Sequence, residues 1–171
     1  VAVYDDVYGW DREDYTGGQE TYNDLANYKV EITLPGDYMV WSTGHQSNEQ
    51  EIFSEDLMEL IEKSRQSSKV INIIIGETYE KGNIFLDNEK HTWKFKAENV
   101  PDFAWACSNY HNWDASNLEL DNGRDIWISA VYPPGSKTFN EVAAVAHQSI
   151  DYLSNVFPGL PYPFNKHTTF N

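Results

Sequence analysis

The sequence has one cysteine, Cys107, among its 171 residues. A disulfide needs two cysteines, so none forms within this sequence, and the cysteine content does not indicate the compartment. A lone cysteine in an apolar run is typical of a buried small residue, because burial raises the pKa of a thiol and makes it unreactive. We expect Cys107 to pack in the core, and a reactive thiol is the alternative.

Basic residues are also scarce. Lys and Arg number 12 against 27 Asp and Glu, which gives a formal net charge of -15 and a pI of about 4.5. Binding to a nucleic acid duplex or an anionic membrane surface needs clustered Lys and Arg, so neither is an expected partner. No stretch is long or apolar enough to span a bilayer. The acidity favours a soluble protein that attracts cations.

Familiar catalytic motifs are missing as well. The sequence has no GxGxxG, P-loop, CxxC pair, GxSxG, EF-hand loop or HExxH, and its five histidines are scattered. We expect His45 to be a loop residue. His147 and Asp151 are one helical turn apart, so they either share a metal ion or proton or make an ordinary surface contact. Residues 108–114, SNYHNWD, form either a site at a strand end or an aromatic core edge with satisfied polar tips.

Residues 1–27 are acidic and aromatic, and glycines interrupt them. We expect a short opening strand followed by a long loop. Carboxylates in such a loop can bind Ca²⁺, but their spacing is not that of an EF-hand, so a solvated acidic face is favoured. The carboxylates concerned are Asp5, Asp6, Asp11, Glu13 and Asp14.

Alternating apolar residues predict several strands. Residues 28–35 alternate with period two, a Pro-Gly-Asp turn follows, and residues 38–45 return, which predicts an antiparallel hairpin. Residues 69–76 are rich in β-branched side chains, and residues 91–98 have one apolar face. The polar stretch 77–90 predicts a loop around a short strand at 84–86.

Residues 54–67 predict an amphipathic helix. Ser54 is a good N-cap, and the helix is expected to bury one apolar stripe against a sheet. After it, Phe103–Cys107 is a nearly uncharged run that predicts a strand buried on both faces, at the centre of the fold. Asn122-Gly123 between two strand-like segments predicts a second hairpin. The predicted stripe consists of Leu57, Leu60, Ile61 and Ser64.

The last third of the sequence predicts a long helix at 138–157. Thr138 and Glu141 have the spacing of a capping box, and Pro158-Gly159 ends the helix. PYPF (161–164) is expected to be an extended link to a final strand. The predicted buried face consists of Val142, Val145, Ala146, Ser149, Leu153, Val156 and Phe157.

Together these patterns predict an α+β protein. It is mainly antiparallel β, in saddle-like or sandwich-like sheets. A short helix lies near 54–67, and a long C-terminal helix near 139–157 packs on a small sheet. The change from strands to a strand–helix–strand order predicts a domain boundary between residues 99 and 100.

Three stretches carry a family resemblance: TWKFKAENVPDFAWACS (92–108), WDAS (113–116) and SIDYLSNVFPGLPYPF (149–164). They resemble zinc aminopeptidases of the M1 (gluzincin) family, and look closest to a bacterial branch of it. VAVYDDVYGW (1–10) and residues 28–44 resemble the last part of that family's N-terminal β saddle.

The resemblance implies that residues 1–99 are the C-terminal portion of the N-terminal β domain. Residues 100–171 would then begin the thermolysin-like catalytic domain. In this family the GxMEN-like motif, the HExxH zinc site and a distant Glu ligand follow later, and the amine-binding residue lies just upstream. We therefore expect a processed or excised segment without catalytic, cofactor-binding or metal-binding residues, inactive by itself.

The resemblance also implies what the parent protein does. The parent would remove N-terminal residues from peptides with zinc-activated water and a Glu general base. The implied partners are the remainder of the catalytic domain and, for the parent, a peptide substrate. The resemblance favours a bacterial extracytoplasmic location.

Two other functions fit the composition. The 6 Trp and 11 Tyr would suit a carbohydrate- or ligand-binding β module without enzymatic activity, which stacks sugars on exposed aromatic rings. A structural or interaction domain is the third possibility. A solvent-exposed row of Trp and Tyr on one sheet face would favour the binding module.

Overall fold

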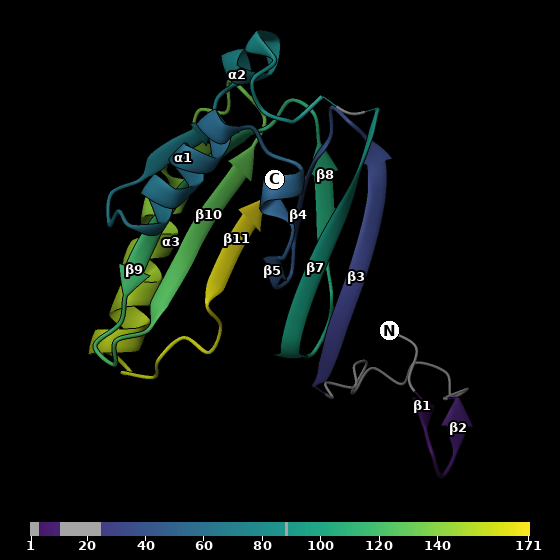
Figure 1. Ribbon diagram of the computed structural model, residues 1–171. Coiled ribbons are helices and arrows are strands. Elements are labelled where there is room, and N and C mark those ends of the chain that lie inside the picture. Colours follow the sequence, from purple (N-terminus) through teal and green to yellow (C-terminus); the bar gives the residue numbers. More distant parts are fainter. Residues whose placement is uncertain (1–3, 11–24, 88) are drawn as a thin grey trace.

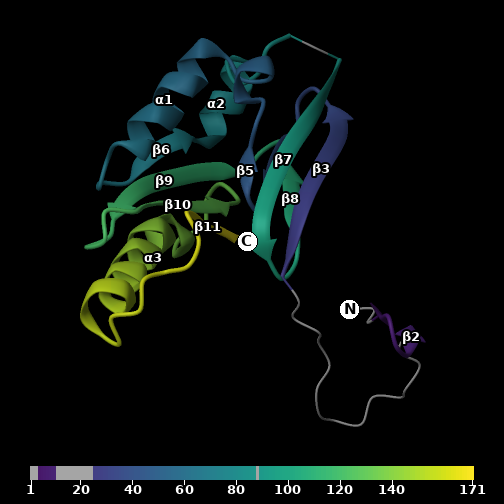
Figure 2. The same ribbon diagram turned by 60° about the horizontal axis from the view of Figure 1, so that its bottom comes forward.

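The computed structural model describes residues 4–10, 25–87 and 89–171. A four-stranded sheet in the order β11-β10-β9-β6 lies beside a group of antiparallel strands (Figure 1). Helix α1 covers one face of the four-stranded sheet and α3 covers the other (Figure 2). The predicted α+β class is confirmed. The four strands are β6 (Ile71–Ile74), β9 (Asn112–Glu119), β10 (Asp125–Tyr132) and β11 (Lys166–Phe170).

The longest antiparallel pair joins β3 (Ala26–Pro35) to β7 (Lys90–Val100). Strand β7 alternates as its sequence predicted, since Trp93, Phe95 and Ala97 are buried and their neighbours are more exposed. The short β5 (His45–Gln46) pairs with the other edge of β7. A separate small hairpin consists of β1 (Tyr4–Asp5) and β2 (Gly9–Trp10).

The predicted hairpin over residues 28–45 is wrong. Strand β3 pairs with β7, and β4 (Met39–Ser42) pairs instead with β8 (Trp105–Ser108). The turn at Pro35 is present, because Tyr38 N donates to Pro35 O at 3.1 Å. All four residues of β4 are buried. A strand that is apolar on both faces needs a layer on each side, which a simple hairpin with β3 would not provide.

The prediction that Phe103–Cys107 forms the doubly buried central strand is also wrong. Strand β8 starts only at Trp105, whose side chain is 49% exposed. This strand pairs with β4. The central strand is β9, which pairs with β6 on one side and β10 on the other. Its buried positions include Asp114 and Ser116. These polar residues interrupt the apolar pattern from which a buried strand is predicted.

The predicted helix near 54–67 is confirmed as α1 (Glu55–Arg65). Ser54 Oγ accepts a hydrogen bond from Leu57 N at 3.2 Å, as an N-cap does. The second hairpin is also confirmed, since β9 and β10 pair around a turn in which Gly123 has φ +80°.

The predicted loop at 77–90 is partly wrong. It contains a short helix, α2 (Gly76–Lys81), which ends at Gly82 with φ +72°. Thr78 Oγ1 accepts a hydrogen bond from Ile75 N at 3.1 Å and holds the first turn, which the sequence pattern did not indicate. In place of the predicted strand at 84–86, Phe85 forms a single bridge with Phe53, which follows the 3-10 helix η1 (Glu49–Glu51).

The C-terminal helix has three parts and differs from its prediction in two respects. They are the 3-10 turn η2 (Phe139–Glu141), α3 (Val142–Asp151) and the π-helical turn η3 (Tyr152–Val156). Thr138 makes no side-chain cap, so the capping box is wrong. The buried side carries Ala143, Ile150 and Ser154. Of the predicted face, Val142 and Ala146 pack partly against the core, and the other members are exposed: Val145, Ser149, Leu153, Val156 and Phe157.

The final strand, β11, runs parallel to β10, as a strand–helix–strand crossover requires. Pairing between β6 and β9 crosses the predicted boundary at residue 99, and the main core contains side chains from both sides of it. The division into 1–99 and 100–171 stays a prediction. No helix in the described part of the chain is long and apolar enough to cross a membrane.

Asp114 links three strands, and this makes a testable prediction. Its carboxylate accepts hydrogen bonds from Asn72 Nδ2 at 2.6 Å and from the Tyr132 hydroxyl at 2.5 Å. Asp114→Ala leaves the buried Tyr132 hydroxyl without this acceptor, at a cost on the order of 1–3 kcal/mol, and also removes the bond from the exposed Asn72. Urea denaturation should show this loss, and Tyr132→Phe should cost less because it removes one bond. Equal stability of wild type and Asp114→Ala would contradict the assignment.

Candidate functional site

A groove of about 940 Å³ lies beside β11. Residues 41–45, 97–106 and 162–170 contribute most of its lining, so it lies between β11 and the strands of the other β group. Large apolar side chains dominate the walls. They are Trp41, Trp105, Phe164 and Phe170.

Lys166, at the start of β11, supplies a cation to this groove. Its Nζ donates a hydrogen bond to Ser42 O at 3.3 Å and lies 5.7 Å from the ring centroid of Trp127. Burial lowers the pKa of Lys166 to about 8. The charge of Arg65 lowers this pKa further, whereas that of Glu49 opposes the shift.

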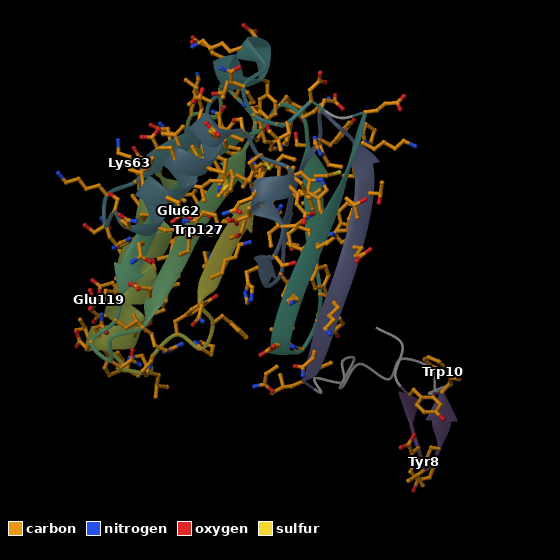
Figure 3. All side chains as sticks on the ribbon, viewed as in Figure 1. Tyr8, Trp10, Glu62, Lys63, Glu119 and Trp127 are labelled. Atoms are coloured by element: carbon orange, nitrogen blue, oxygen red, sulfur yellow. The ribbon has the colours of Figure 1, made fainter. Side chains whose placement is uncertain are left out.

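Arg65 lies near the same indole ring but is already neutralised. Its guanidinium carbon is 4.8 Å from the Trp127 ring centroid. It forms ion pairs with Glu49 at 2.5 Å and Glu62 at 2.6 Å. Trp127 Nε1 donates to Ser64 Oγ at 3.0 Å, which places the indole beneath α1 (Figure 3).

No sequence pattern indicates that Lys166, Arg65 and Trp127 form a group. The alternation within KHTTF shows only that Lys166 and Thr168 share one side of the strand. Arg65 and Trp127 come from a helix and a strand far away in the sequence. No local pattern states which of these elements meet.

His167 lies next along β11, and both of its ring nitrogens have partners. The Tyr162 hydroxyl is 3.3 Å from Nδ1, and Thr169 Oγ1 is 3.0 Å from Nε2. Burial lowers the pKa of His167 and raises that of Tyr162. A hydroxyl partner at each nitrogen holds the His167 ring in one orientation in the groove wall.

His147 and Asp151 do not form the shared metal or proton site considered above. His147 Nδ1 is 3.0 Å from Ser116 Oγ, and Asp151 accepts from Asn155 Nδ2 at 2.7 Å. Burial lowers the pKa of His147 more than the charge of Asp151 raises it. Ser116 has no exposed surface, so no substrate can reach its hydroxyl. The arrangement stabilises the contact between α3 and β9.

Residues 108–114 form an aromatic core edge, as the structural alternative had it, but not all of its polar tips are satisfied, since Trp113 Nε1 is buried without a hydrogen-bond partner among the described residues. His111 is buried, with Nδ1 2.5 Å from Ser108 Oγ and Nε2 3.0 Å from Asn171 O. Its ring stacks on Phe170 at a centroid distance of 5.0 Å. This histidine therefore fixes the end of β11 and the rear wall of the groove.

The remaining candidates lie apart from one another. His45 is exposed at the groove rim and belongs to β5 rather than to the predicted loop. Cys107 is partly buried against the main core. Asp6 is exposed, Asp5 is described only as part of β1, and the other three acidic candidates, Asp11, Glu13 and Asp14, lie outside the described residues.

The described ranges contain no set of ligands for a metal ion. No group of three or more His, Cys, Asp or Glu side chains there could hold a metal ion. The family resemblance implies a zinc whose ligands lie outside this sequence, and a catalytic zinc takes three protein ligands.

Buried histidines make the stability depend on pH. Burial lowers the pKa values of His91, His147 and His167 below the ordinary value of 6.5. As the pH falls below 6.5, the unfolded chain binds protons that the folded chain does not, so stability decreases toward acid pH. The urea concentration at the midpoint of unfolding should therefore decrease when the pH is lowered from about 7.5 to about 5.5.

Replacing one of these histidines should weaken that dependence. His91→Gln is expected to reduce the change in midpoint, and the exposed His45→Gln serves as the matched control. A midpoint that is the same at both pH values would contradict the prediction.

Comparison of the chain with models of known protein families gave no match, and comparison with curated proteins gave none either.

Proposed function

We propose that this chain is a non-catalytic segment of an M1-type zinc aminopeptidase. It would comprise the later part of the N-terminal β domain and the start of the catalytic domain. The support from the sequence is the resemblance of residues 92–108, 113–116 and 149–164 to that family. The complete protein would hydrolyse N-terminal residues from peptides with zinc-activated water, using residues outside this chain.

The structural observation that carries the proposal is the outward stripe of the C-terminal helix. Val145, Leu153 and Val156 are 54%, 52% and 64% exposed. The helix instead buries Ala143, Ile150 and Ser154, of which only Ile150 is large and apolar. Large side chains normally face the core because burying each contributes roughly 1.5–3 kcal/mol.

The exposed surface continues past the helix. Phe157 and Leu160 are also exposed, so the stripe extends into the segment that leads to β11. A contiguous apolar surface of this kind marks a place where another protein part packs. The remainder of the catalytic domain is the partner that the family resemblance supplies, and α3 would then lie between two layers.

Leu153 provides a test of this packing. In the 171-residue chain, Leu153→Ala should change the free energy of unfolding by at most about 0.5 kcal/mol, because the side chain is exposed. In the complete protein the same substitution should cost about 2–5 kcal/mol, because the side chain would be buried. Chemical denaturation measures both values, and exposed Lys137→Ala is the control. Similar small effects in both proteins would rule out the packing.

The activity is tested on the complete protein with a fluorogenic aminoacyl amide. We expect hydrolysis that a zinc chelator abolishes and added zinc restores, whereas an N-acetylated substrate should not react. The 171-residue chain, assayed in parallel, should show no turnover. A complete protein without this activity, or with activity unaffected by chelation, would overturn the proposal.

The alternative of a carbohydrate-binding β module gains no support. It requires a row of exposed aromatic rings on one sheet face, but Trp41, Trp93 and Trp113 are buried. Tyr4 and Trp10 are exposed on the β1–β2 hairpin and contact each other at 5.2 Å, away from the larger sheets (Figure 3).

A further inference from the structure

Lys166 is a cation whose charge is not balanced by an ion pair. Within the described part of the chain, the ion pairs are formed by Arg65, Lys81 and Lys94, and none includes Lys166. Of the three donors on the Lys166 ammonium, one reaches Ser42 O. Glu49 attracts Lys166 from a distance, but its carboxylate already accepts the short bond from Arg65.

The surroundings of this cation differ from the rest of the molecule. The chain is strongly acidic overall, yet Lys166 faces a groove with apolar walls. Glu98 and Asp102 also line the groove, but both are exposed, where water and salt screen their charges. A desolvated ammonium without a counter-charge is unfavourable, and burial accordingly lowers the pKa of Lys166 to about 8.

Thr168 adds a second polar group on the same side of β11. Its hydroxyl oxygen is buried and has no hydrogen-bond partner among the described residues. Residues i and i+2 of a strand project to one face, so Thr168 lies next to Lys166 along the groove. Buried polar groups are usually paired. Other buried groups of the described residues also lack a partner, but Thr168 differs from those of the core, such as Trp93, because it lines the groove beside Lys166.

We propose that the groove beside β11 binds an organic monoanion with an aromatic body, whose carboxylate or sulfonate is held by Lys166 and Thr168. The anionic head would accept the free donors of the ammonium and the Thr168 hydroxyl. The ring would lie against Trp105, Phe164 and Phe170. This arrangement matches the common design of a ligand site, a mainly apolar concave surface with few polar groups that fix orientation.

The test uses 2-naphthoate and its neutral counterpart 2-naphthamide on the 171-residue chain. Both are fluorescent and have the same ring system, so they differ mainly in charge. Titration followed by naphthalene fluorescence anisotropy should show that the chain binds naphthoate at least about tenfold more tightly, the effect of one charged hydrogen bond. Equal affinity for the two compounds, or no binding of either, would overturn the proposal.

Variants then locate the anion. Lys166→Met keeps the length of the side chain and removes its charge, and it should abolish the preference for naphthoate. Lys166→Arg should retain the preference, and Lys137→Met, in the exposed loop after β10, should leave it unchanged. If Lys166→Met still prefers naphthoate, the anion binds elsewhere and the proposal fails. Circular dichroism checks that each variant is folded, and for a variant that unfolds, the wild-type comparison of the two compounds still decides.

This binding requires neither zinc nor peptidase activity. The titration is therefore independent of the aminopeptidase assay, and either proposal can fail while the other holds.

Discussion

The edge-to-face contact between Trp41 and Trp113 joins the two β systems of the molecule. Their ring centroids are 6.0 Å apart, and Trp113 in turn meets Trp127 at 5.5 Å. Trp41 comes from β4 and Trp113 from β9, so each sheet contributes one ring to a shared core. Aromatic pairs stabilise beyond their buried area and have a preferred geometry, so this contact fixes the angle between the sheets.

The same aromatic series sets the position of the charged groups. Trp127 lies near two cations, and their different partners give them different roles. Arg65 pairs with Glu62 of its own helix and with Glu49 of η1, and its contact with Trp127 joins α1 to the sheet. Lys166 donates a hydrogen bond to a backbone carbonyl, that of Ser42, and lines the groove. Trp41 also contacts Phe170 at 5.7 Å, so the core and the groove wall are parts of one packed unit.

Local sequence patterns predicted the elements whose stability is local. The Ser54 cap, the alternation of β7 and the Asn-Gly turn each act within a few residues. Pairing across the chain was not predictable in this way: β3 finds β7 about sixty residues away, and β8 finds β4 at a similar separation. The apolar stripe of the C-terminal helix was predicted, but the side of the helix that faces the sheet was not. Periodicity identifies an apolar face but does not say what that face contacts. The groove brings together residues 41–45, 97–106 and 162–170, which are far apart in the sequence. The sequence shows these residues but does not show that they lie side by side.

The position of β11 at the margin of its sheet has a consequence for handling the chain. Asn171 N donates to Val131 O, and the bond from Trp127 N to Asn165 O lies at the other end of the same ladder. Backbone groups alternate along a strand, so those of Lys166, Thr168 and Phe170 point away from β10. Unpaired backbone donors and acceptors along a margin form a template onto which another copy can add a strand. Addition of a strand from a second copy at β11 would increase with concentration, and dilution or charged substitutions near this margin would oppose it.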